Sequence, residues 1–329
     1  MDTHIGNDIQ IAAALLEAGE LVAIPTETVY GLAANALDSA AVAKIYAAKN
    51  RPSFNPLILH LANTNQITDY AFADAMSLKL AHHFMPGPLT LLLPKKEIVP
   101  DITTAGSPKV AIRVPDQSLT LSLLNRLHFP LAAPSANPSG YISPTNAHHV
   151  MDGLRGKIPY ILDGGNTKVG LESTICEVVG KEIILHRAGS ISADDLSAFS
   201  GLTVVNATNA QINHTIAQSD ADNQPATPGQ LKSHYAPHTP LYIGNIPQLL
   251  QDHAGKKIAV ISFDTEYTGA TNFKLAPDHQ LSTAASNLFA TLREIDRLHF
   301  DIILAEIFPN EGVGIAINDR ISRAQFILK

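Results

Sequence analysis

A polar stretch that begins near residue 206 divides the chain into two unequal parts, and it limits the possible folds more than any other feature of the sequence. Residues 206–230 are rich in Asn, Thr, Gln, Asp and Pro and contain few large apolar side chains. A segment of this composition buries too little apolar surface to form a core, so it is typical of a linker. The sequence therefore predicts a larger domain over residues 1–204, a linker or lid over residues 205–240 and a smaller domain over residues 241–329.

Both flanking parts alternate short apolar strands with helical patterns. Before the linker we expect helices over residues 7–18, 39–49, 75–84 and 118–127, and strands over residues 21–25, 57–61, 89–93, 110–114, 131–133, 160–163, 174–179 and 182–186. After the linker we expect strands over residues 257–262 and 301–305, a helix over residues 283–298 and a helical tail from Val313. This mixture predicts an α/β or α+β fold, with a small α/β unit at the end of the chain.

Composition and charge exclude several classes of protein. The formal net charge is −7, from 23 Lys+Arg and 30 Asp+Glu, so no global field attracts nucleic acid or anionic lipid and any basic site must be local. The single cysteine, Cys176, cannot form an internal disulfide or a thiolate metal cage, and we expect it to be a small buried apolar group. No apolar run approaches about 18 residues, and no basic segment precedes the first one. We therefore expect a cytoplasmic protein without a membrane segment.

Several well-known site motifs are missing from the sequence. It contains no G-x-x-x-x-G-K-[ST] phosphate loop, no G-x-G-x-x-G dinucleotide fingerprint and no G-x-S-x-G nucleophile turn. His234 and His238 stand four residues apart, but no carboxylate or cysteine stands beside them. We therefore expect no dedicated metal site made of protein side chains.

Two loops carry residue types that bind anions. The segment from Lys49 to Pro56 places two cations and several hydrogen-bonding side chains between a helix end and a strand, and two prolines stiffen it. It fits an anion site, but also a plain helix end with favourable cations. The small residues and hydroxyls of residues 134–145 suit the close approach of a phosphate without a Walker lysine, although an ordinary turn-rich loop has the same composition.

Arg113 lies in the apolar strand expected over residues 110–114, and a buried arginine needs an anion. That anion is either a ligand carboxylate or the partner in a structural salt bridge. Residues 172–174 and 186–189 place polar groups beside buried strands and have the same ambiguity. Together these segments describe a concave site with several cations, many hydroxyls and no evident nucleophile–base pair, which suits a nucleotide or a similar anion.

Six of these segments, taken in order, resemble a known family. They are Pro25–Leu32, the set Lys49, Arg51, Ser53 and Asn55, Ala111–Pro115, Pro134–Asn137, Glu172–Thr174 and His186–Gly189. In this order they resemble the YrdC-type family of L-threonylcarbamoyladenylate synthases over about residues 10–195. Ser233–Pro237 resembles the long form of that family, which carries an extra C-terminal domain.

The resemblance implies both a fold and an activity. The fold would be a YrdC-like twisted open α/β sheet domain with a central cavity, followed by a smaller Rossmann-like α/β domain. The activity would join L-threonine, bicarbonate or CO2, and ATP into threonylcarbamoyl-AMP and pyrophosphate, with Mg²⁺ accompanying ATP. The product would pass to a downstream tRNA threonylcarbamoyl transferase complex that modifies adenosine 37 of tRNAs reading ANN codons. Weak RNA binding would be compatible with the basic cavity.

The resemblance also implies roles for individual residues, each taken from a matching motif position. The threonine-binding residues would be Thr28, His60, Arg113, Ser173 and the backbone at Ala133. The ATP-binding residues would be Lys49, Arg51, Asn55, Lys109, Ser135, Asn137, Ser143, Arg187 and Tyr235. Among these, Lys49 and Arg51 would be the catalytic cations. At position 109 the family is expected to have a smaller residue that contacts ATP. The resemblance therefore leaves open whether Lys109 contacts ATP through its side chain or only through its backbone.

Two alternatives to this activity remain at the level of sequence. The same fold could grip double-stranded RNA without catalysis, although the net charge and the absence of a basic run argue against it. The domain could also transfer a carbamoyl group through carbamoyl-AMP, although the chain lacks the zinc-finger and acylphosphatase-like segments that accompany such domains.

The second part of the linker differs from the first in stiffness. Residues 225–237 contain three prolines and one aromatic hydroxyl, Tyr235. They fit either a plain spacer between domains or a lid that closes over the cavity with Tyr235 on ATP. We expect the lid.

Overall fold

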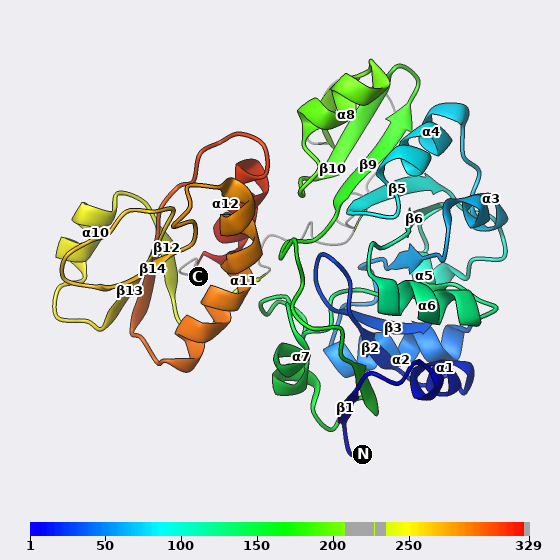
Figure 1. The fold of residues 1–329 in the computed structure, drawn as a ribbon, viewed down its shortest axis with the longest axis horizontal. Coiled ribbons are helices and arrows are strands. Elements are labelled where there is room, and N and C mark those ends of the chain that lie inside the picture. Colours follow the sequence, from blue (N-terminus) through cyan, green and yellow to red (C-terminus); the bar gives the residue numbers. More distant parts are fainter. Residues whose placement is uncertain (208–226, 228–234, 326–329) are drawn as a thin grey trace.

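Two β-sheets of unequal size organise the chain (Figure 1). The computed structural model describes residues 1–207, 227 and 235–325. Most of the expected linker, including Ser233 and His234, lies outside the described residues. Within them, the larger sheet ends with a strand that stops at Asn206 and the smaller sheet begins with a strand at Leu241. The domain boundaries expected from the sequence agree with these positions but stay predictions.

The larger sheet has 11 strands within the described residues and mixes parallel with antiparallel pairs. Across the sheet the strands are β1 (His4–Gly6), β8 (Tyr160–Leu162), β2 (Val22–Ile24), β3 (Gly31–Asn35), β7 (Leu131–Ala132), β4 (Ile58–His60), β6 (Lys109–Arg113), β5 (Leu89–Pro94), β9 (Thr174–Val179), β10 (Glu182–Arg187) and β11 (Thr203–Asn206). The parallel pair β4 and β6 has one functional consequence. Its register places His60 directly beside Arg113, at the ends of their strands.

Helices cover both faces of this sheet, which explains its continuous apolar strands. The helices are α1 (Ile9–Glu17), α2 (Ser39–Lys49), α3 (Ile67–Tyr70), α4 (Ala75–Phe84), α5 (Asp101–Thr104), α6 (Ser118–Arg126), α7 (Ala147–Leu154) and α8 (Ala193–Ser200), with a short 3-10 turn η1 (Thr64–Gln66). Strand β2 illustrates the arrangement. Val22 and Ile24 pack in one core cluster with α1 and α6, whereas Ala23 packs in another with α2, because side chains alternate across a strand.

Helix α2 delivers the cationic segment to the sheet. The side chain of Asp38 caps its N-terminus and accepts a hydrogen bond from the backbone N–H of Ala40 at 2.9 Å. Its C-terminus stops at Asn50, which adopts a left-handed conformation with φ 51°. Because that conformation reverses the chain direction, the backbone N–H of Arg51 returns to the helix and donates to the carbonyl of Tyr46.

The smaller sheet has four parallel strands within the described residues, in the order β12 (Leu241–Ile243), β15 (Ile302–Ala305), β13 (Ile258–Ser262) and β14 (Thr271–Lys274). Helix α10 (Ile246–Asp252) covers one face, and α11 (Leu281–Arg297) and α12 (Gly314–Ala324) cover the other. Figure 1 shows α11 and α12 on the side that faces the larger domain. The expected small α/β unit is therefore confirmed.

Most expected elements exist in the structure, and the missed ones are short or lack strong apolar periodicity. The expected helices over residues 39–49 and 75–84 are α2 and α4 with the same bounds, and the helical tail is α12. Strand β3, helix α7 and the edge strand β14 were not expected. Cys176 is fully buried, as expected, and burial raises the pKa of its thiol to about 12. Among the described residues no helix combines the length and the apolar character needed to cross a membrane.

Candidate functional site

A small cavity lies in the larger domain, where several strand ends and loops converge. It is lined by Thr26, Thr28, Val29, Gly31, Arg51, Ile58, His60, Arg113, Ala133, Pro134, Ser135, Glu172, Ser173, Arg187 and Tyr235. Nine of the fourteen residues expected from the sequence are in this set, although they come from positions 28 to 235 of the chain. The fold therefore brings most of the expected site together. The roles assigned to these residues stay predictions.

Arg113, at the end of β6, lines the cavity. Its side chain is almost fully buried, and Nη1 donates to the hydroxyl of Thr28 at 2.9 Å. Nη2 lies 2.6 Å from a carboxylate oxygen of Glu27, another buried residue. Arg113 thus forms a structural ion pair and also lines the cavity. The sequence left open whether its anion is a salt-bridge partner or the carboxylate of a ligand, and the structure is compatible with both at once.

His60 stands beside Arg113 as a neutral side chain. Its Nδ1 lies 3.1 Å from the carbonyl oxygen of Ile58. Burial, reinforced by the charge of Arg113, lowers the pKa of His60 to about 3. At neutral pH the imidazole can therefore exchange hydrogen bonds with a ligand, but it adds no positive charge to the cavity.

Two further guanidinium groups, from Arg51 and Arg187, line the same cavity. Nε of Arg51 donates to the carbonyl of Asn55 at 3.2 Å, and its Nη2 donates to that of Pro56 at 2.9 Å. Arg187 donates from Nε to the carbonyl of Ser173 and from Nη2 to its hydroxyl, both at 3.0 Å. Burial lowers the pKa of each arginine to about 10, so both stay charged at neutral pH. Three buried guanidinium groups in one cavity favour a polyanionic ligand.

Lys49 lies behind the cavity wall rather than on its surface. Its Nζ donates to the backbone carbonyls of Ser135 and Asn137, and the side chain is fully buried. Burial, with a smaller contribution from Arg51, holds the pKa of the ammonium well below its usual value. Lys49 therefore fixes the course of the loop at 135–137. The catalytic role expected for it stays a prediction.

Two asparagines expected to contact ATP are buried with unused hydrogen-bonding capacity. Neither side-chain amide atom of Asn55 has a hydrogen-bond partner in the described structure, and the same holds for Oδ1 of Asn137. Nδ2 of Asn137 donates to the carbonyls of Pro138 and Tyr141 at 2.9 and 2.7 Å. An unpaired buried amide group costs about 1–3 kcal/mol, so such groups are typical of ligand sites.

The remaining two expected residues lie outside the cavity lining. The hydroxyl of Ser143 donates to Oε1 of Glu172 at 2.6 Å and so orients a carboxylate that does line the cavity. Nζ of Lys109 pairs with Glu177, which His186 also approaches at 3.2 Å. The ammonium of Lys109 is thus engaged in a cluster on β6, β9 and β10. A side-chain contact between Lys109 and ATP stays a prediction.

Two acidic residues of the site received no role from the sequence. Glu27 and Glu172 both stand inside recognised motifs, but an acidic residue was not expected in an anion site. The only indication of these carboxylates in the sequence was that a buried arginine, Arg113, requires an anion. Among the described residues no cluster of three His, Cys, Asp or Glu side chains could hold a metal ion.

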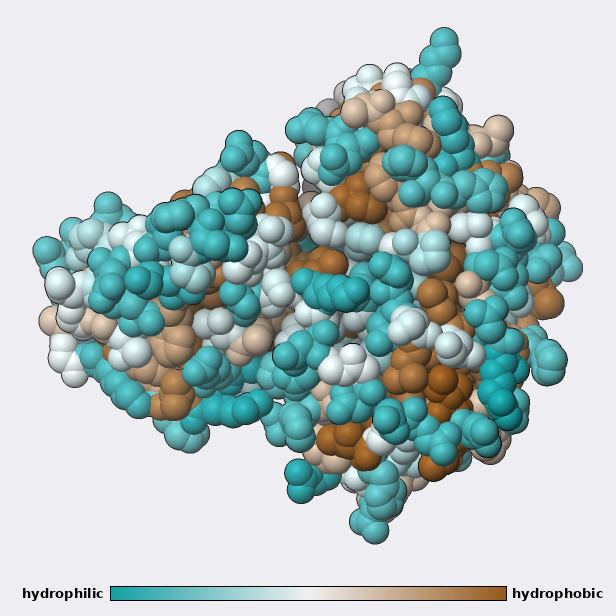
Figure 2. Space-filling view, viewed as in Figure 1, coloured by the Kyte–Doolittle hydropathy of each residue, from teal (hydrophilic) through white to brown (hydrophobic). Residues whose placement is uncertain are grey.

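Tyr235, from the segment expected to be the linker or lid, lines the cavity and packs against the smaller domain. This residue is almost fully buried, with φ 65°, and its ring lies 5.3 Å from that of Phe289 on α11. The next residue, Ala236, donates from its backbone N–H to the carbonyl of Gly140 at 2.9 Å. Figure 2 shows hydrophobic residues at the seam between the two domains, beneath a largely hydrophilic surface. Tyr235 thus lies at the cavity, as the lid hypothesis requires.

Comparisons with known protein families match almost the whole chain. A family model for Sua5, YciO and YrdC proteins, described as "Telomere recombination", matches residues 14–189. A second model, described as "Threonylcarbamoyl-AMP synthase, C-terminal domain", matches residues 192–325. Threonylcarbamoyl-AMP synthase of Bacillus subtilis is 41% identical, over 97% of this chain and 93% of the relative.

Comparisons with solved structures agree with these matches. The crystal structure of Pyrococcus abyssi Sua5 complexed with L-threonine has a TM-score of 0.85 and 36% identity, and the match covers 98% of this chain and 97% of that one. The structure of E. coli YciO has a TM-score of 0.52 and 20% identity, over 59% of this chain and 98% of that one. The second likeness concerns the fold alone. The expected YrdC-like fold with an additional C-terminal domain is confirmed.

Proposed function

The chain belongs to the threonylcarbamoyl-AMP synthase family, and from this premise we propose that it forms threonylcarbamoyl-AMP and pyrophosphate from L-threonine, bicarbonate or CO2, and ATP. The reaction class would be nucleotidyl transfer. The observation that carries the proposal is the group of three buried guanidinium groups, from Arg51, Arg113 and Arg187, around one cavity that also contains hydroxyls.

Two groups of residues in and behind the cavity lining suit the two larger substrates. Arg113 offers a fork of donors to the carboxylate of threonine, beside the hydroxyl of Thr28 and the neutral imidazole of His60. The relative from Pyrococcus abyssi was solved with L-threonine, which supports an amino acid as one ligand. Arg51, Arg187 and the loop that Lys49 anchors suit the phosphates of ATP.

The chemistry requires positioning more than a strong base. The amine of threonine and CO2 combine to a carbamate and release one proton. A carbamate oxygen then attacks the α-phosphorus of ATP, and pyrophosphate leaves with the electron pair of the broken bond. The difficulty is the approach of one anion to another, and the buried cations lower that repulsion. The unused amide groups of Asn55 and Asn137 suit hydrogen bonding to the nucleotide.

We propose that Mg²⁺ enters with ATP. Glu27 and Glu172, the carboxylates that line or adjoin the cavity, are already paired with arginines, and the described residues contain no metal-binding cluster. The side chains present therefore fit a metal ion carried by the phosphates rather than one held by the protein. Threonylcarbamoyl-AMP is a reactive mixed anhydride, so we propose that it passes to a tRNA threonylcarbamoyl transferase complex.

Burial of the cavity's cations disfavours the RNA-binding alternative. Arg51, Arg113 and Arg187 are each less than 9% exposed. A protein that grips double-stranded RNA needs exposed cations along its surface, because the phosphates lie on the outside of the duplex. Weak RNA binding would therefore use residues outside this cavity.

The test is pyrophosphate release in the presence of ATP, bicarbonate and a panel of amino acids. We expect release that requires both threonine and bicarbonate. At threonine concentrations below the KM of the unsubstituted protein, release should fall about tenfold or more in Arg113→Ala. It should be kept in Arg126→Ala, which removes an exposed arginine of the same domain at the end of α6. Formation of ADP and orthophosphate would contradict nucleotidyl transfer. Competition between double-stranded RNA and ATP would favour the RNA-binding alternative.

A further inference from the structure

One side chain of the smaller domain reaches the wall of the cavity in the larger domain. Arg320, on α12, is 1% exposed, and its Nε lies 3.1 Å from Oε2 of Glu172. Its Nη2 donates to the backbone carbonyl of Ala188 at 2.9 Å. The two partners belong to the loops that flank β9 and β10, so Arg320 binds both loops at once.

The partner of Arg320 is an unusual group for an anion site. Glu172 is buried and lines the cavity together with three arginines. Its Oε1 accepts the hydrogen bond of Ser143, and its Oε2 faces Arg320. A carboxylate without a countercharge in this position would repel the phosphates of ATP, and low local polarity would strengthen the repulsion.

Glu172 also competes with ATP for a cation. Its charge acts on Arg187, where it raises the pKa that burial has lowered. Without Arg320, the attraction between Glu172 and Arg187, which line the same cavity, would lose one counteracting positive charge. The ion pair with Arg320 offsets part of this attraction.

Arg320 has a second function in the same place. Its guanidinium carbon lies 5.5 Å from the centre of the Tyr235 ring, within the range of a cation–π contact. Asp319 Oδ2 lies 2.8 Å from Nη1, but Asp319 also pairs with Arg323 at 2.9 Å, so the two arginines of α12 together face two carboxylates, Asp319 and Glu172. The guanidinium group therefore holds Glu172, the backbone at Ala188 and the ring of Tyr235 in one arrangement.

We propose that Arg320 is a positioning residue for ATP binding: it neutralises Glu172, so that the cavity accepts phosphates only when the C-terminal domain is docked. This inference rests on the proposed function for the identity of the ligand. Among the described residues, the other cations of the site, Arg51, Arg113 and Arg187, all belong to the larger domain. The proposal therefore gives the smaller domain an electrostatic role in ATP binding.

The test is a double-mutant cycle on ATP affinity, measured by equilibrium binding without threonine. Arg320→Met keeps the apolar stem and removes the charge, and we expect it to weaken ATP at least about tenfold. Glu172→Gln should not weaken ATP. The double variant should bind ATP within about threefold of Glu172→Gln alone, because no charge remains to be neutralised. Arg297→Met, which removes a half-exposed arginine of the same domain interface, is the matched control and should bind ATP normally.

Several outcomes would overturn the proposal. Equal ATP affinity in Arg320→Met and in the double variant would mean that Arg320 acts only through structure. Normal ATP affinity in Arg320→Met, or a tenfold loss in Glu172→Gln alone, would also contradict it. If Arg320→Met does not fold, Arg320→Lys and Glu172→Gln still decide the question, since the lysine should retain ATP affinity within a few-fold. Failure of the proposed function would appear instead as absent threonine-dependent pyrophosphate release in the unsubstituted protein.

Discussion

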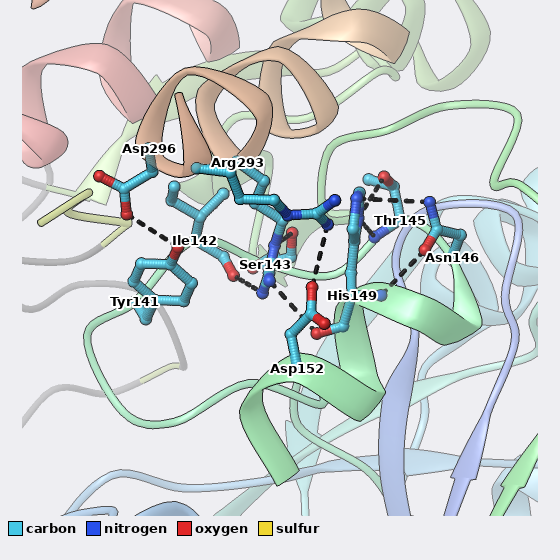
Figure 3. Close-up of polar contacts among 10 residues, drawn as sticks. Tyr141, Ile142, Ser143, Thr145, Asn146, His149, Asp152, Arg293 and Asp296 are labelled. Carbon is cyan, nitrogen blue, oxygen red and sulfur yellow. Dashed lines mark hydrogen bonds and ion pairs between the residues drawn. The ribbon is translucent and has the colours of Figure 1, made fainter. Parts of the chain in front are cut away.

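Replacing Arg293 by alanine should weaken the attachment of the smaller domain more than any neighbouring change. Arg293 lies on α11, is 2% exposed and points into the larger domain (Figure 3). Its guanidinium group donates to three backbone carbonyls, those of Ile142 at 2.5 Å, His149 at 3.2 Å and Ser143 at 3.4 Å. The carbonyl of His149 lies within α7 and also belongs to the hydrogen-bond ladder of that helix. The carbonyls of Ile142 and Ser143 lie outside the helices and strands, so the substitution removes the side-chain donor of each.

The expected loss follows from these contacts. A hydrogen bond from a charged donor contributes about 1.5–3 kcal/mol, and an unpaired buried carbonyl adds to the cost of losing it. Two of the three hydrogen bonds, those to Ile142 and His149, are well formed. Arg293→Ala should therefore lower the free energy of unfolding by about 3–5 kcal/mol. Arg297, one turn further along α11, pairs with Asp152 at 2.9 Å, but both side chains are about half exposed. Arg297→Ala should therefore cost about 1 kcal/mol or less.

Urea denaturation followed by circular dichroism distinguishes these values. With a denaturant slope of about 3 kcal/mol per M, Arg293→Ala should lower the unfolding midpoint by about 1 M or more. Arg297→Ala should lower it by less than about 0.4 M. Arg293→Lys should fall between them, because one ammonium group cannot reach three carbonyls. Equal midpoints in the two alanine variants would refute the assignment of Arg293 as the main polar anchor.

Four further outcomes are expected. Arg113→Ala should raise the KM for threonine about 10–100-fold and leave the KM for ATP within about threefold, because the carboxylate of threonine loses its guanidinium donors. In steady-state kinetics with each substrate varied, an equal rise of both KM values would mean that Arg113 only supports Glu27. Lys49→Ala should lower kcat and the melting temperature together, because the loop at 135–137 loses its anchor; a normal kcat would remove Lys49 from the mechanism. His149 is held neutral by burial, its pKa lowered to about 3, so the unfolded chain takes up the proton first as the pH falls below about 6.5. The free energy of unfolding should therefore fall as the pH is lowered from about 6.5 to about 3, by up to about 1.4 kcal/mol per pH unit. In urea titrations at several pH values, His149→Asn should make this pH dependence weaker. Serine should replace threonine with kcat/KM reduced about 10–200-fold, because only a methyl contact separates them; complete exclusion of serine would contradict that reasoning.

Local patterns predicted the regular elements well where apolar periodicity was strong. Helix α11 illustrates this, because its apolar residues recur at helical spacing along the sequence. Strand β3 was missed because its sequence, Gly-Leu-Ala-Ala-Asn, lacks the branched and aromatic side chains that favour strands. Edge strand β14 was missed because it is largely exposed and shows little apolar alternation.

The candidate site could be assembled from sequence because its cations and hydroxyls stand in ordered motifs. The sequence did not indicate which of them face the cavity. Lys49 and Arg51 are two residues apart, yet Arg51 lines the cavity while Lys49 turns behind the loop at 135–137. The left-handed turn at Asn50 separates their directions. Asparagine adopts this conformation more readily than most residues, but its presence does not require it.

By itself the sequence determined two α/β parts, a polar segment between them and one anion site without a nucleophile, since each depends on composition or on short-range spacing. Only the tertiary structure decided how the two parts complete one site. Arg320 and Glu172 are 148 positions apart, and Arg293 reaches carbonyls up to 151 positions away. On an amphipathic helix an arginine that faces another domain has the same sequence pattern as one that faces water. The difference arises only when the domains dock, because burial then makes each unpaired charge costly and each partner specific.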